Sequence, residues 1–440
     1  MEHHHLEGLY PHDARYVELE QLLTYIKDGN SAQLIGVPGV GRGNLCKFLV
    51  YNHNVRINHL GGDQTRYHFV FTNFAEVKNR PLGDVLKFMF LQLVSSLHER
   101  RNEDAFIKTD TMFKKALSYK DELVLFQGLK DAVDYLVHEK DLHIIFLFER
   151  FELYIPLLTD NFFVHLRSLR ERAKYRFSVV FSLNRPLEDL VEPKILADFY
   201  EFFAGHIVYV GLSDKPGIQF RIAYLQQLAD KKLTKTQMET LTELTGGHGK
   251  LMRLGAEALL ASTTTVEKNM EQFLLSQKTI QGALFEIWSF LTPSEQHFLS
   301  KKPKETPPEF LIDVGLIIPK GTLAISLLKP FLTKEDSQTD TYKIMYDVTT
   351  NTIKKGDINI SEKLTAAEFR LLQFFLEHKN TILDRDTIIS AVWKDTATTA
   401  GVTDQALDQL IFRLRKKLEE DPNNPRYIIT VKGRGIKFTL

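Results

Sequence analysis

A glycine-rich segment near the N-terminus has the residue types and the spacing of an anion-binding loop. The run from Gly36 to Gly43 reads Gly-Val-Pro-Gly-Val-Gly-Arg-Gly, and it stands between a strand-like run and an apolar helical pattern. Glycines let a backbone wrap around a phosphate with its N–H groups, and the N-terminus of the next helix adds a favourable dipole. The sequence therefore predicts a nucleotide phosphate site that takes ATP or ADP. The predicted contacts are Gly36, Gly39, Val40, Gly41, Arg42, Gly43 and Asn44.

Two positions of this loop depart from the common pattern, in which a Lys is followed by Ser or Thr. Arg42 offers positive charge, but its planar guanidinium is not equivalent to the point charge of Lys. Gly43 has no hydroxyl to hold Mg²⁺, so the metal is left open, with Asn44 as a substitute ligand. Nucleotide binding is favoured over hydrolysis, and weak ATPase activity is left open. The alternative is that the glycines only make a tight strand-to-helix turn.

An acidic residue follows the most apolar run of the chain. Glu149 comes directly after His143–Phe148, a run with almost no polar alternation. A carboxylate at the carboxyl end of a strand beside a phosphate loop can orient a metal ion or a water molecule. Glu149 is therefore a candidate catalytic residue, and the alternative is an ordinary charged strand end.

Length and composition indicate several domains of ordinary globular type. The chain has 440 residues, 43% hydrophobic and 25% charged, which disfavours wholesale disorder and a disulfide scaffold. Lys plus Arg equals Asp plus Glu at 56 each, so any attraction for nucleic acid must come from a local patch. A single cysteine, Cys46, and the lack of a long apolar run or a cleavable signal predict a cytoplasmic location.

The first half of the chain alternates strand-like runs with helical patterns, which predicts a parallel sheet with crossover helices on both faces. The five predicted strands are 32–36, 68–74, 143–148, 177–183 and 206–212. The strand signals then stop, and 220–261 is predicted to be helical with an interruption at Gly246-Gly247. A helical pattern, a short helix capped by Thr292 and two strand-like runs follow, which is typical of a small winged helix.

These patterns predict an α/β domain with a helical lid, followed by two winged-helix domains. A polar stretch without apolar residues marks a linker between the two winged helices. The predicted boundaries are 1–12 for an N-terminal tail, 13–212 for the α/β domain, 213–275 for the lid, 276–332 for the first winged helix, 333–340 for the linker and 341–440 for the second winged helix.

The first three quarters of the chain resemble the AAA+/STAND class of P-loop ATPases. The matching segments are 13–19, the glycine-rich loop, Glu149-Arg150-Phe151, Asn184-Arg185-Pro186 and 245–253 in the lid. The resemblance implies that Asn184 is a polar sensor facing the γ-phosphate and a second catalytic candidate. It also implies that Arg253 or His248 contacts the nucleotide from the lid. The alternatives are a turn residue for Asn184 and a loop residue packed at a helix start for His248.

The last hundred residues contain the best-patterned helix of the chain, predicted over 403–420. Its apolar residues fall on one face, and the opposite face carries Gln405, Gln409, Phe412, Arg413 and Lys416. From 405 onward, eight Lys or Arg (413, 415, 416, 417, 426, 432, 434 and 437) stand against four acids (408, 419, 420 and 421). Gln and Arg can read base edges in a major groove, while Lys416 and Lys417 suit phosphate. The alternative is a solvated basic face on a packing domain.

The segments 364–372, 391–393, 412–419 and 427–435 resemble the OmpR/PhoB-type winged-helix domain, in order and with the expected spacing. The resemblance implies double-stranded DNA as the partner, with Arg413 and Lys416 on the recognition helix. It places Arg434 on the wing, a hairpin with a basic tip, whereas Arg415 is as suited to bracing the fold. Thr365 with Glu368 predicts a capping box, and Asp384 or Asp386 is predicted to cap the next helix.

Three functions follow from these patterns. The first is a transcriptional regulator in which a nucleotide-binding module controls the C-terminal winged helix. The second is an active STAND-type NTPase in a signalling or defence assembly, and Arg42 and Gly43 count against it. The third is a DNA-binding interaction platform without nucleotide. Homo-oligomer formation is left open, and no cluster of His and Cys predicts a metal site.

Overall fold

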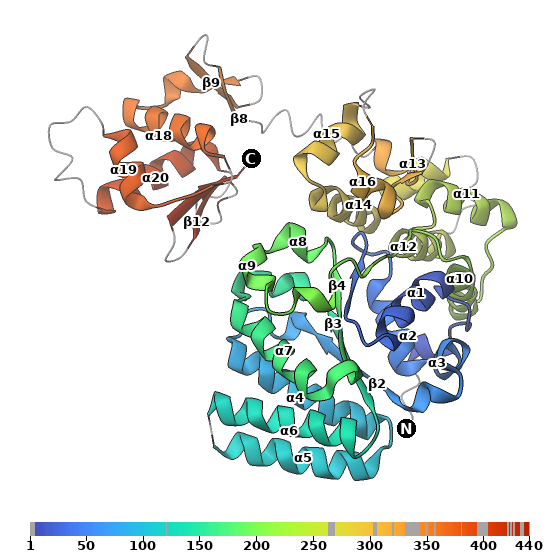
Figure 1. Cartoon of the computed structure of the whole chain (residues 1–440). Helices are drawn as coiled ribbons and strands as arrows, with labels where there is room; N and C mark the ends of the chain where they lie inside the picture. The colour runs from blue at the N-terminus through green and yellow to red at the C-terminus, as the bar shows by residue number, and fades with distance from the viewer. Residues whose placement is uncertain are drawn as a thin grey trace. The chain divides into compact units, whose positions relative to one another are not determined.

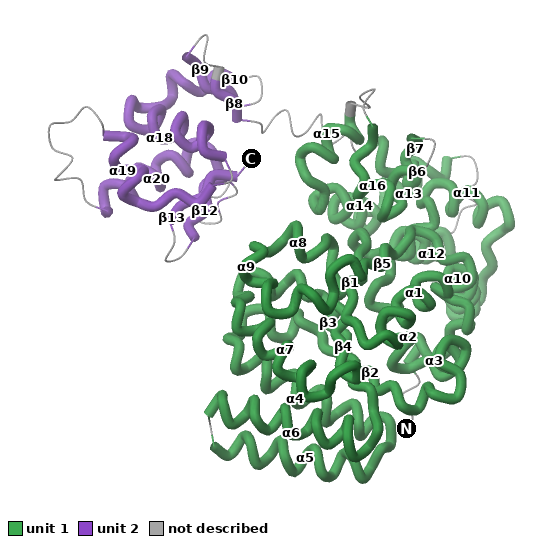
Figure 2. The backbone as a smooth tube through the Cα atoms, in the orientation of Figure 1, with its two compact units in different colours: residues 1–331 green, residues 332–440 purple. Residues whose placement is uncertain are grey.

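The chain divides into two compact units, residues 1–331 and 332–440 (Figure 2). The computed structural model describes residues 5–119, 121–262, 269–301, 306–318, 321–330, 344–347, 351–355, 358–379, 381–393, 404–419, 422, 425, 427–431 and 435–439. The predicted linker 333–340 lies outside the described residues.

Unit 1 is built on a five-stranded sheet in which every neighbouring pair is parallel. The strand order is β2-β3-β4-β1-β5, so β1 lies between β4 and β5. The strands are β1 (Ala32–Ile35), β2 (Tyr67–Asn73), β3 (His143–Glu149), β4 (Phe177–Leu183) and β5 (Ile207–Tyr209). All five predicted strands are confirmed, with β5 shorter than expected. Because the strands are parallel, the residues that follow β1, β3 and β4 lie at one edge of the sheet.

Helices flank this sheet, and Figure 1 shows α7 on one side of it and α1 and α2 on the other. Helix α1 contacts β1 and β5, α4 contacts β2, α6 contacts β3 and α7 contacts β4. The helices are α1 (Tyr16–Lys27), α2 (Arg42–Tyr51), α3 (His53–Leu60), α4 (Leu82–Glu99), α5 (Glu103–Ser118), α6 (Glu122–His138), α7 (Asp160–Ala173), α8 (Leu187–Leu190) and α9 (Pro193–Leu196). This is the α/β P-loop NTPase fold predicted from the sequence.

The lid is more broken than the sequence pattern suggested. Its helices are α10 (Lys215–Ala229), α11 (Lys235–Thr245), α12 (Gly249–Ala261) and α13 (Met270–Ser276). The interruption at Gly246 is confirmed, but a second break at 230–234 was not predicted. Asp230 takes a left-handed conformation with φ of 46°, and Thr234 then starts α11 through a capping box with Gln237.

A small winged helix completes unit 1. It comprises α14 (Lys278–Phe290), α15 (Pro293–Lys301), α16 (Glu309–Asp313), β6 (Ile317–Ile318) and β7 (Thr322–Leu323). Strands β6 and β7 pair antiparallel. The predicted cap of α15 is confirmed, since the Thr292 Oγ1 accepts from the Glu295 N–H (3.4 Å) and the Glu295 carboxylate accepts from the Thr292 N–H (2.8 Å).

Unit 2 has a core of its own, to which two small sheets and three helices contribute. Its first sheet has the order β10-β9-β8 and its second β11-β13-β12. The elements are β8 (Ile344–Asp347), β9 (Thr352–Lys355), β10 (Ile358–Asn359), α18 (Ala366–Glu377), β11 (Ile382–Leu383), α19 (Arg385–Val392), α20 (Asp404–Leu418), β12 (Ile428–Val431) and β13 (Gly435–Phe438). The capping box of Thr365 with Glu368 is confirmed, and Asp384 is the residue that caps α19.

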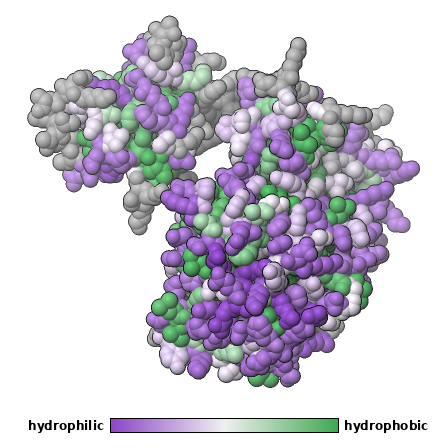
Figure 3. All heavy atoms as spheres, in the orientation of Figure 1, coloured by the Kyte–Doolittle hydropathy of each residue, from purple (hydrophilic) through white to green (hydrophobic). Residues whose placement is uncertain are grey.

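On the face shown in Figure 3, hydrophilic side chains predominate and apolar side chains lie in small separate groups. No helix among the described residues combines the length and the apolar character that crossing a membrane requires.

Candidate nucleotide site and nucleic-acid interface

The glycine-rich loop connects β1 to α2, as predicted, and two of its glycines have backbone conformations that other residues rarely adopt. Gly39 has φ of 82° and Gly41 has φ of 111°. Gly41 precedes the first residue of α2 and accepts the Leu45 N–H, so the loop ends on the N-terminus of that helix. Gly36 has a different role, since a Cβ there would meet Val40 at 2.9 Å, and it does not line the cavity described below.

Three groups hold this loop from outside through its backbone carbonyls. The Arg15 Nη2 donates to Val40 O (2.9 Å), the His248 Nε2 to Pro38 O (2.9 Å) and the Lys250 N–H to Gly39 O (3.0 Å). His248 also caps α12, and burial lowers its pKa to about 4, so the ring is neutral at neutral pH. Of the two alternatives predicted for His248, the loop residue packed at a helix start describes its position. Sequence reasoning gave Arg15 no role of its own.

Arg42 lies at the carboxyl edge of the sheet among polar groups from two other strands. Its Nη2 donates to the Asn184 Oδ1 just after β4, and it lies 3.5 Å from the Glu152 Oε1 after β3. Its Nη1 and the Glu152 Oε2 are buried without a partner. Burial lowers the pKa of Arg42, and Glu152 and Glu149 oppose that effect. An arginine stays protonated even there, so the loop contains a buried positive charge with an unused donor.

Glu149 ends β3 and points its carboxylate at the first turn of α2. A Cβ added to Gly43 would lie 3.0 Å from the Glu149 Oε1. The next residue, Arg150, has φ of 57°, and this sharp turn returns Phe151 to the core, where its ring lies 5.7 Å from that of Phe148. Burial raises the pKa of the Glu149 carboxyl, although Arg150 and Arg42 act in the opposite direction.

These residues surround a cavity of about 880 Å³. The predicted residues Gly39, Val40, Gly41, Arg42, Gly43, Asn44, Glu149, Asn184 and Arg253 all line it. The Arg253 guanidinium is bonded to Glu257 in its own helix (2.9 and 3.0 Å), so its contact with a nucleotide stays a prediction. Arg221 also lines the cavity with a buried, unpartnered Nε, and nothing in the local sequence pattern marks it.

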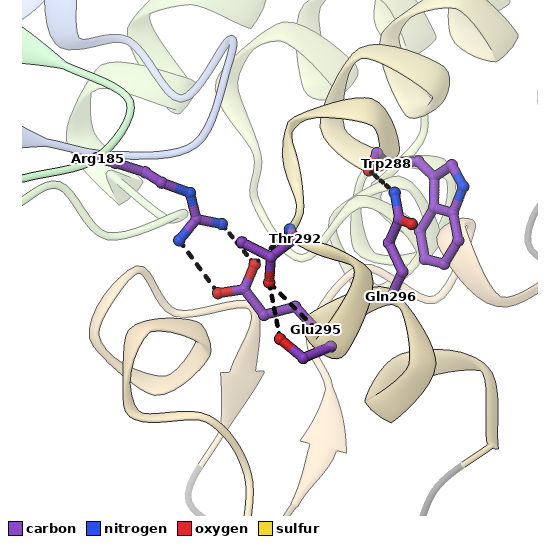
Figure 4. Close-up of polar contacts among 6 residues, drawn as sticks. Arg185, Trp288, Thr292, Glu295 and Gln296 are labelled. Carbon is purple, nitrogen blue, oxygen red and sulfur yellow. Dashed lines mark hydrogen bonds and ion pairs between the residues drawn. The ribbon is translucent and has the colours of Figure 1, made fainter. Parts of the chain in front are cut away.

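A second polar group joins this edge of the sheet to the small winged helix of unit 1 (Figure 4). Arg185, next to Asn184, binds both carboxylate oxygens of Glu295 on α15. Its guanidinium lies 4.8 Å from the ring centre of Phe290 and 4.2 Å from that of Phe310. The Arg185 and Glu295 side chains are 13% and 6% exposed, so this ion pair is largely withdrawn from water.

The residues of this site fit a nucleotide, whereas the residues at the usual Mg²⁺ position do not fit the metal ion. The loop offers backbone N–H groups at a helix N-terminus, and the buried Arg42 Nη1 and Arg221 Nε lack acceptors. Position 43 has no hydroxyl, and the Glu149 carboxylate stands against it. Among the described residues, no group of three or more His, Cys, Asp or Glu is arranged to hold a metal ion.

In unit 2, α20 buries one face and exposes the other, as its pattern predicted. Leu407, Leu410, Ile411, Leu414 and Leu418 belong to the core of the unit. The residues predicted to face DNA, Gln405, Gln409, Phe412, Arg413 and Lys416, are all exposed. The Lys416 Nζ lies 4.8 Å from the Phe412 ring centre, so these two residues form one amphipathic patch.

The other basic residues of this helix have structural contacts. Arg415 donates to Ile428 O (3.0 and 2.7 Å) and Thr430 Oγ1 (2.9 Å), so it braces β12. Lys417 was predicted to contact DNA, but its ammonium donates to Lys363 O (2.7 Å) and pairs with the nearly buried Glu368. The short loop before α18 therefore reaches the end of α20, and because Lys417 is still exposed, its contact with DNA stays a prediction. Arg434 lies outside the described residues.

Residues 360–438 match the family described as "Transcriptional regulatory protein, C terminal", and they form an OmpR/PhoB-type winged helix. PetR of Rhodobacter capsulatus is 31% identical over 136 residues, which are 30% of this chain and 53% of PetR. The transcriptional regulatory protein YvrH of Bacillus subtilis is 34% identical over 115 residues, 26% of this chain and 46% of YvrH. The chain thus spans about half the length of these curated relatives.

Solved structures resemble both units. The DNA-binding domain of Klebsiella pneumoniae RstA, in complex with the RstA box, is 28% identical and covers 22% of this chain and 90% of its own, with a TM-score of 0.19. A Walker-type ATPase of Pyrococcus abyssi is 16% identical and covers 78% and 93%, with a TM-score of 0.42. Both TM-scores are below 0.5, so the fold of unit 1 is assigned from the order and the parallel direction of its strands.

Proposed function

We propose that this protein is a DNA-binding transcriptional regulator in which a nucleotide-binding P-loop module controls the C-terminal winged helix. The exposed face of α20 carries the DNA-binding part of this proposal. It presents two amides, Arg413 and Lys416 on a helix whose opposite side is fixed in the core. Such a face suits a major groove, where Arg and Gln read base edges and Lys binds phosphate.

Recovery of bound genomic DNA from the full chain tests this part, followed by titration of the enriched site over a range of salt concentrations. We expect one enriched motif and a log–log salt slope that falls by about 1 in Lys416→Ala, because one phosphate contact is lost. Lys108→Ala, which removes an exposed ion pair with Glu139 on α5–α6, is the matched control and should leave the slope unchanged. Failure to bind any duplex at low salt would remove the proposal.

The cavity beside the glycine-rich loop supports the nucleotide-binding part. The Arg42 Nη1, the Glu152 Oε2 and the Arg221 Nε are buried, lack partners and belong to residues that line this one cavity. Leaving such groups unsatisfied is costly, about 1–3 kcal/mol each, and a bound ligand would satisfy them. A nucleotide offers phosphate oxygens to the two arginines and hydroxyl or amino donors to the carboxylate.

The control part rests on a connected set of contacts. Arg42 in the loop binds Asn184, and the adjacent Arg185 binds Glu295 of the small winged helix. A phosphate that draws Arg42 away from Asn184 changes the end of β4, which holds Arg185. A nucleotide can shift the position of the winged helix only if it binds the two arrangements with different affinity.

Two measurements separate this function from the NTPase and platform alternatives. Nucleotide should raise the melting temperature of the full chain without phosphate release above background, because Gly43 offers no hydroxyl for a metal ion. Phosphate release that Glu149→Gln abolishes would instead support the NTPase. The absence of both effects would support the platform. The predicted domain boundaries and the cytoplasmic location belong to this same proposal.

A further inference from the structure

The loop of this protein places a carboxylate where related loops need a hydroxyl. Ser or Thr at the position of Gly43 normally helps to hold Mg²⁺. Here a Cβ at Gly43 would lie 3.0 Å from the Glu149 Oε1 and 3.6 Å from its Cδ. Glycine is therefore what allows Glu149 to approach α2 so closely, and the space beside the first turn of α2 contains a side-chain oxygen of the protein.

Arg42 places a fixed positive charge at the same point. A guanidinium presents a planar fork that can bind two phosphate oxygens at once, and it stays charged when buried. One arm of that fork is engaged by Asn184 and Glu152, and the Nη1 of the other has no partner. The loop thus has its own cation with a free donor, which is the role that a metal ion has in related sites.

We propose that this loop binds a nucleoside diphosphate without a divalent metal ion, with Arg42 supplying the positive charge. This inference rests on the proposed nucleotide binding and adds its ligand class and its independence of metal. The diphosphate is favoured over the triphosphate because of the local charges. Two carboxylates, Glu149 and Glu152, act on Arg42 itself. Of the other cations that line the cavity, Arg150 is paired with Glu149 (3.7 Å), and Arg221 lies on α10. A third phosphate without a metal ion to shield it would meet the like charges of those two carboxylates.

Calorimetric titration of the full chain with ADP tests the proposal, once with excess EDTA and once with excess Mg²⁺. We expect the two dissociation constants to agree within about twofold, well below the tenfold that corresponds to about 1.4 kcal/mol. In EDTA, ATP should bind at least about tenfold more weakly than ADP. ADP binding that requires Mg²⁺, or ATP binding as tight as that of ADP in EDTA, would overturn this inference while nucleotide binding itself stands. Absence of binding under both conditions would remove both proposals.

Two variants identify the residues responsible. Arg42→Gln should weaken ADP binding in EDTA at least about tenfold, whereas Lys108→Gln on the remote α5–α6 helices should not change it. The double variant Arg42→Lys/Gly43→Thr supplies the common Lys and hydroxyl, and its ADP binding should become stronger with Mg²⁺. A folded double variant whose affinity ignores Mg²⁺ would contradict the role given to positions 42 and 43. Melting curves show whether each variant is folded. If the double variant does not fold, the comparison of wild-type ADP binding in EDTA and in Mg²⁺ decides whether binding is independent of metal.

Discussion

Arg413 and Arg415 lie two residues apart on α20, and the fold gives them different surroundings. Arg413 is exposed on the face that carries Gln409 and Lys416. Arg415 turns to β12 and donates three hydrogen bonds to Ile428 and Thr430. Two residues of the same type in one basic run therefore test function and stability separately.

We expect Arg413→Ala to weaken specific DNA binding by about 1–3 kcal/mol, the usual value of a bidentate contact with a base, without changing the stability of unit 2. Arg415→Ala should lower the free energy of unfolding by about 1–3 kcal/mol because carbonyl and hydroxyl acceptors lose their donor. Fluorescence anisotropy with the enriched DNA site and chemical denaturation measure the two effects. An Arg413→Ala variant that loses stability would show that this residue supports the fold.

Helix ends are the elements that the sequence predicted best. Thr365 with Glu368 was recognisable because a capping box is a local pattern of four residues, and Thr292 was recognisable as a cap, although its partner Glu295 was not predicted. The same pattern at Thr234 and Gln237 was overlooked, so one helix was expected where α10 and α11 stand. The strands were found because apolar runs without polar alternation predict a buried parallel sheet.

Contacts between distant residues could not be predicted in the same way. Arg42 and Asn184 are 142 positions apart, and Arg185 and Glu295 are 110 positions apart. Hydrophobic period and capping patterns report only neighbours within a few turns. The partners of Arg42 and Lys417 depend on which strands and helices lie side by side, which only the tertiary structure shows.

The Glu368 carboxylate links the start of α18 to the end of α20, and it predicts a pH dependence. Burial alone would raise the pKa of Glu368, but Lys417 and Thr365 outweigh burial and hold the pKa below its ordinary value of 4.5. A lowered pKa stabilises the fold above the ordinary value, and that stability is lost as pH falls through the folded pKa. Unit 2 should therefore lose stability below about pH 4.5.

Glu368→Gln keeps the capping geometry but removes the charge, so it should reduce stability at pH 7 and flatten the loss at acidic pH. Chemical denaturation of residues 332–440 between neutral and acidic pH measures this. Glu377→Gln, at an exposed position of the same helix, is the control. Equal acid sensitivity in wild type and Glu368→Gln would assign the effect to other carboxylates.

The Arg185–Glu295 ion pair predicts how firmly the small winged helix is attached. Glu295→Gln retains the cap of α15 but leaves Arg185 without its charged partner, so we expect a loss of about 3 kcal/mol in the stability of unit 1. The control is Glu257→Gln, which breaks the more exposed pair with Arg253 and should cost less than about 1 kcal/mol. Denaturant unfolding of the full chain compares them. Similar losses in both variants would show that Arg185 is not buried as described.

At the scale of the whole molecule, the proposed control requires that nucleotide and DNA influence each other. The chain has equal numbers of basic and acidic residues, 56 of each, so any attraction for DNA must come from a local patch rather than from the total charge. Coupling between two binding sites is reciprocal, since each ligand changes the affinity of the other by the same factor.

We expect ADP to change the DNA dissociation constant by about fivefold or more, and DNA to change the ADP dissociation constant by the same factor. Glu295→Gln should bring this factor close to one, because it disconnects the small winged helix from the end of β4. Anisotropy and calorimetry on the full chain supply the two constants. A DNA dissociation constant that does not change with ADP would contradict the proposed control by nucleotide, but it would not contradict DNA binding.

Three contacts hold the backbone carbonyls of the glycine-rich loop, and they come from Arg15, His248 and Lys250. These contacts affect the rate of ligand binding and the change in heat capacity that accompanies it. A loop that is already braced has little motional freedom left to lose when an anion arrives. We therefore expect the ligand to bind a preorganised loop, with a high association rate constant and a small change in heat capacity on binding. A slow step in the binding kinetics would instead indicate that residues on the side of the cavity opposite this loop become ordered.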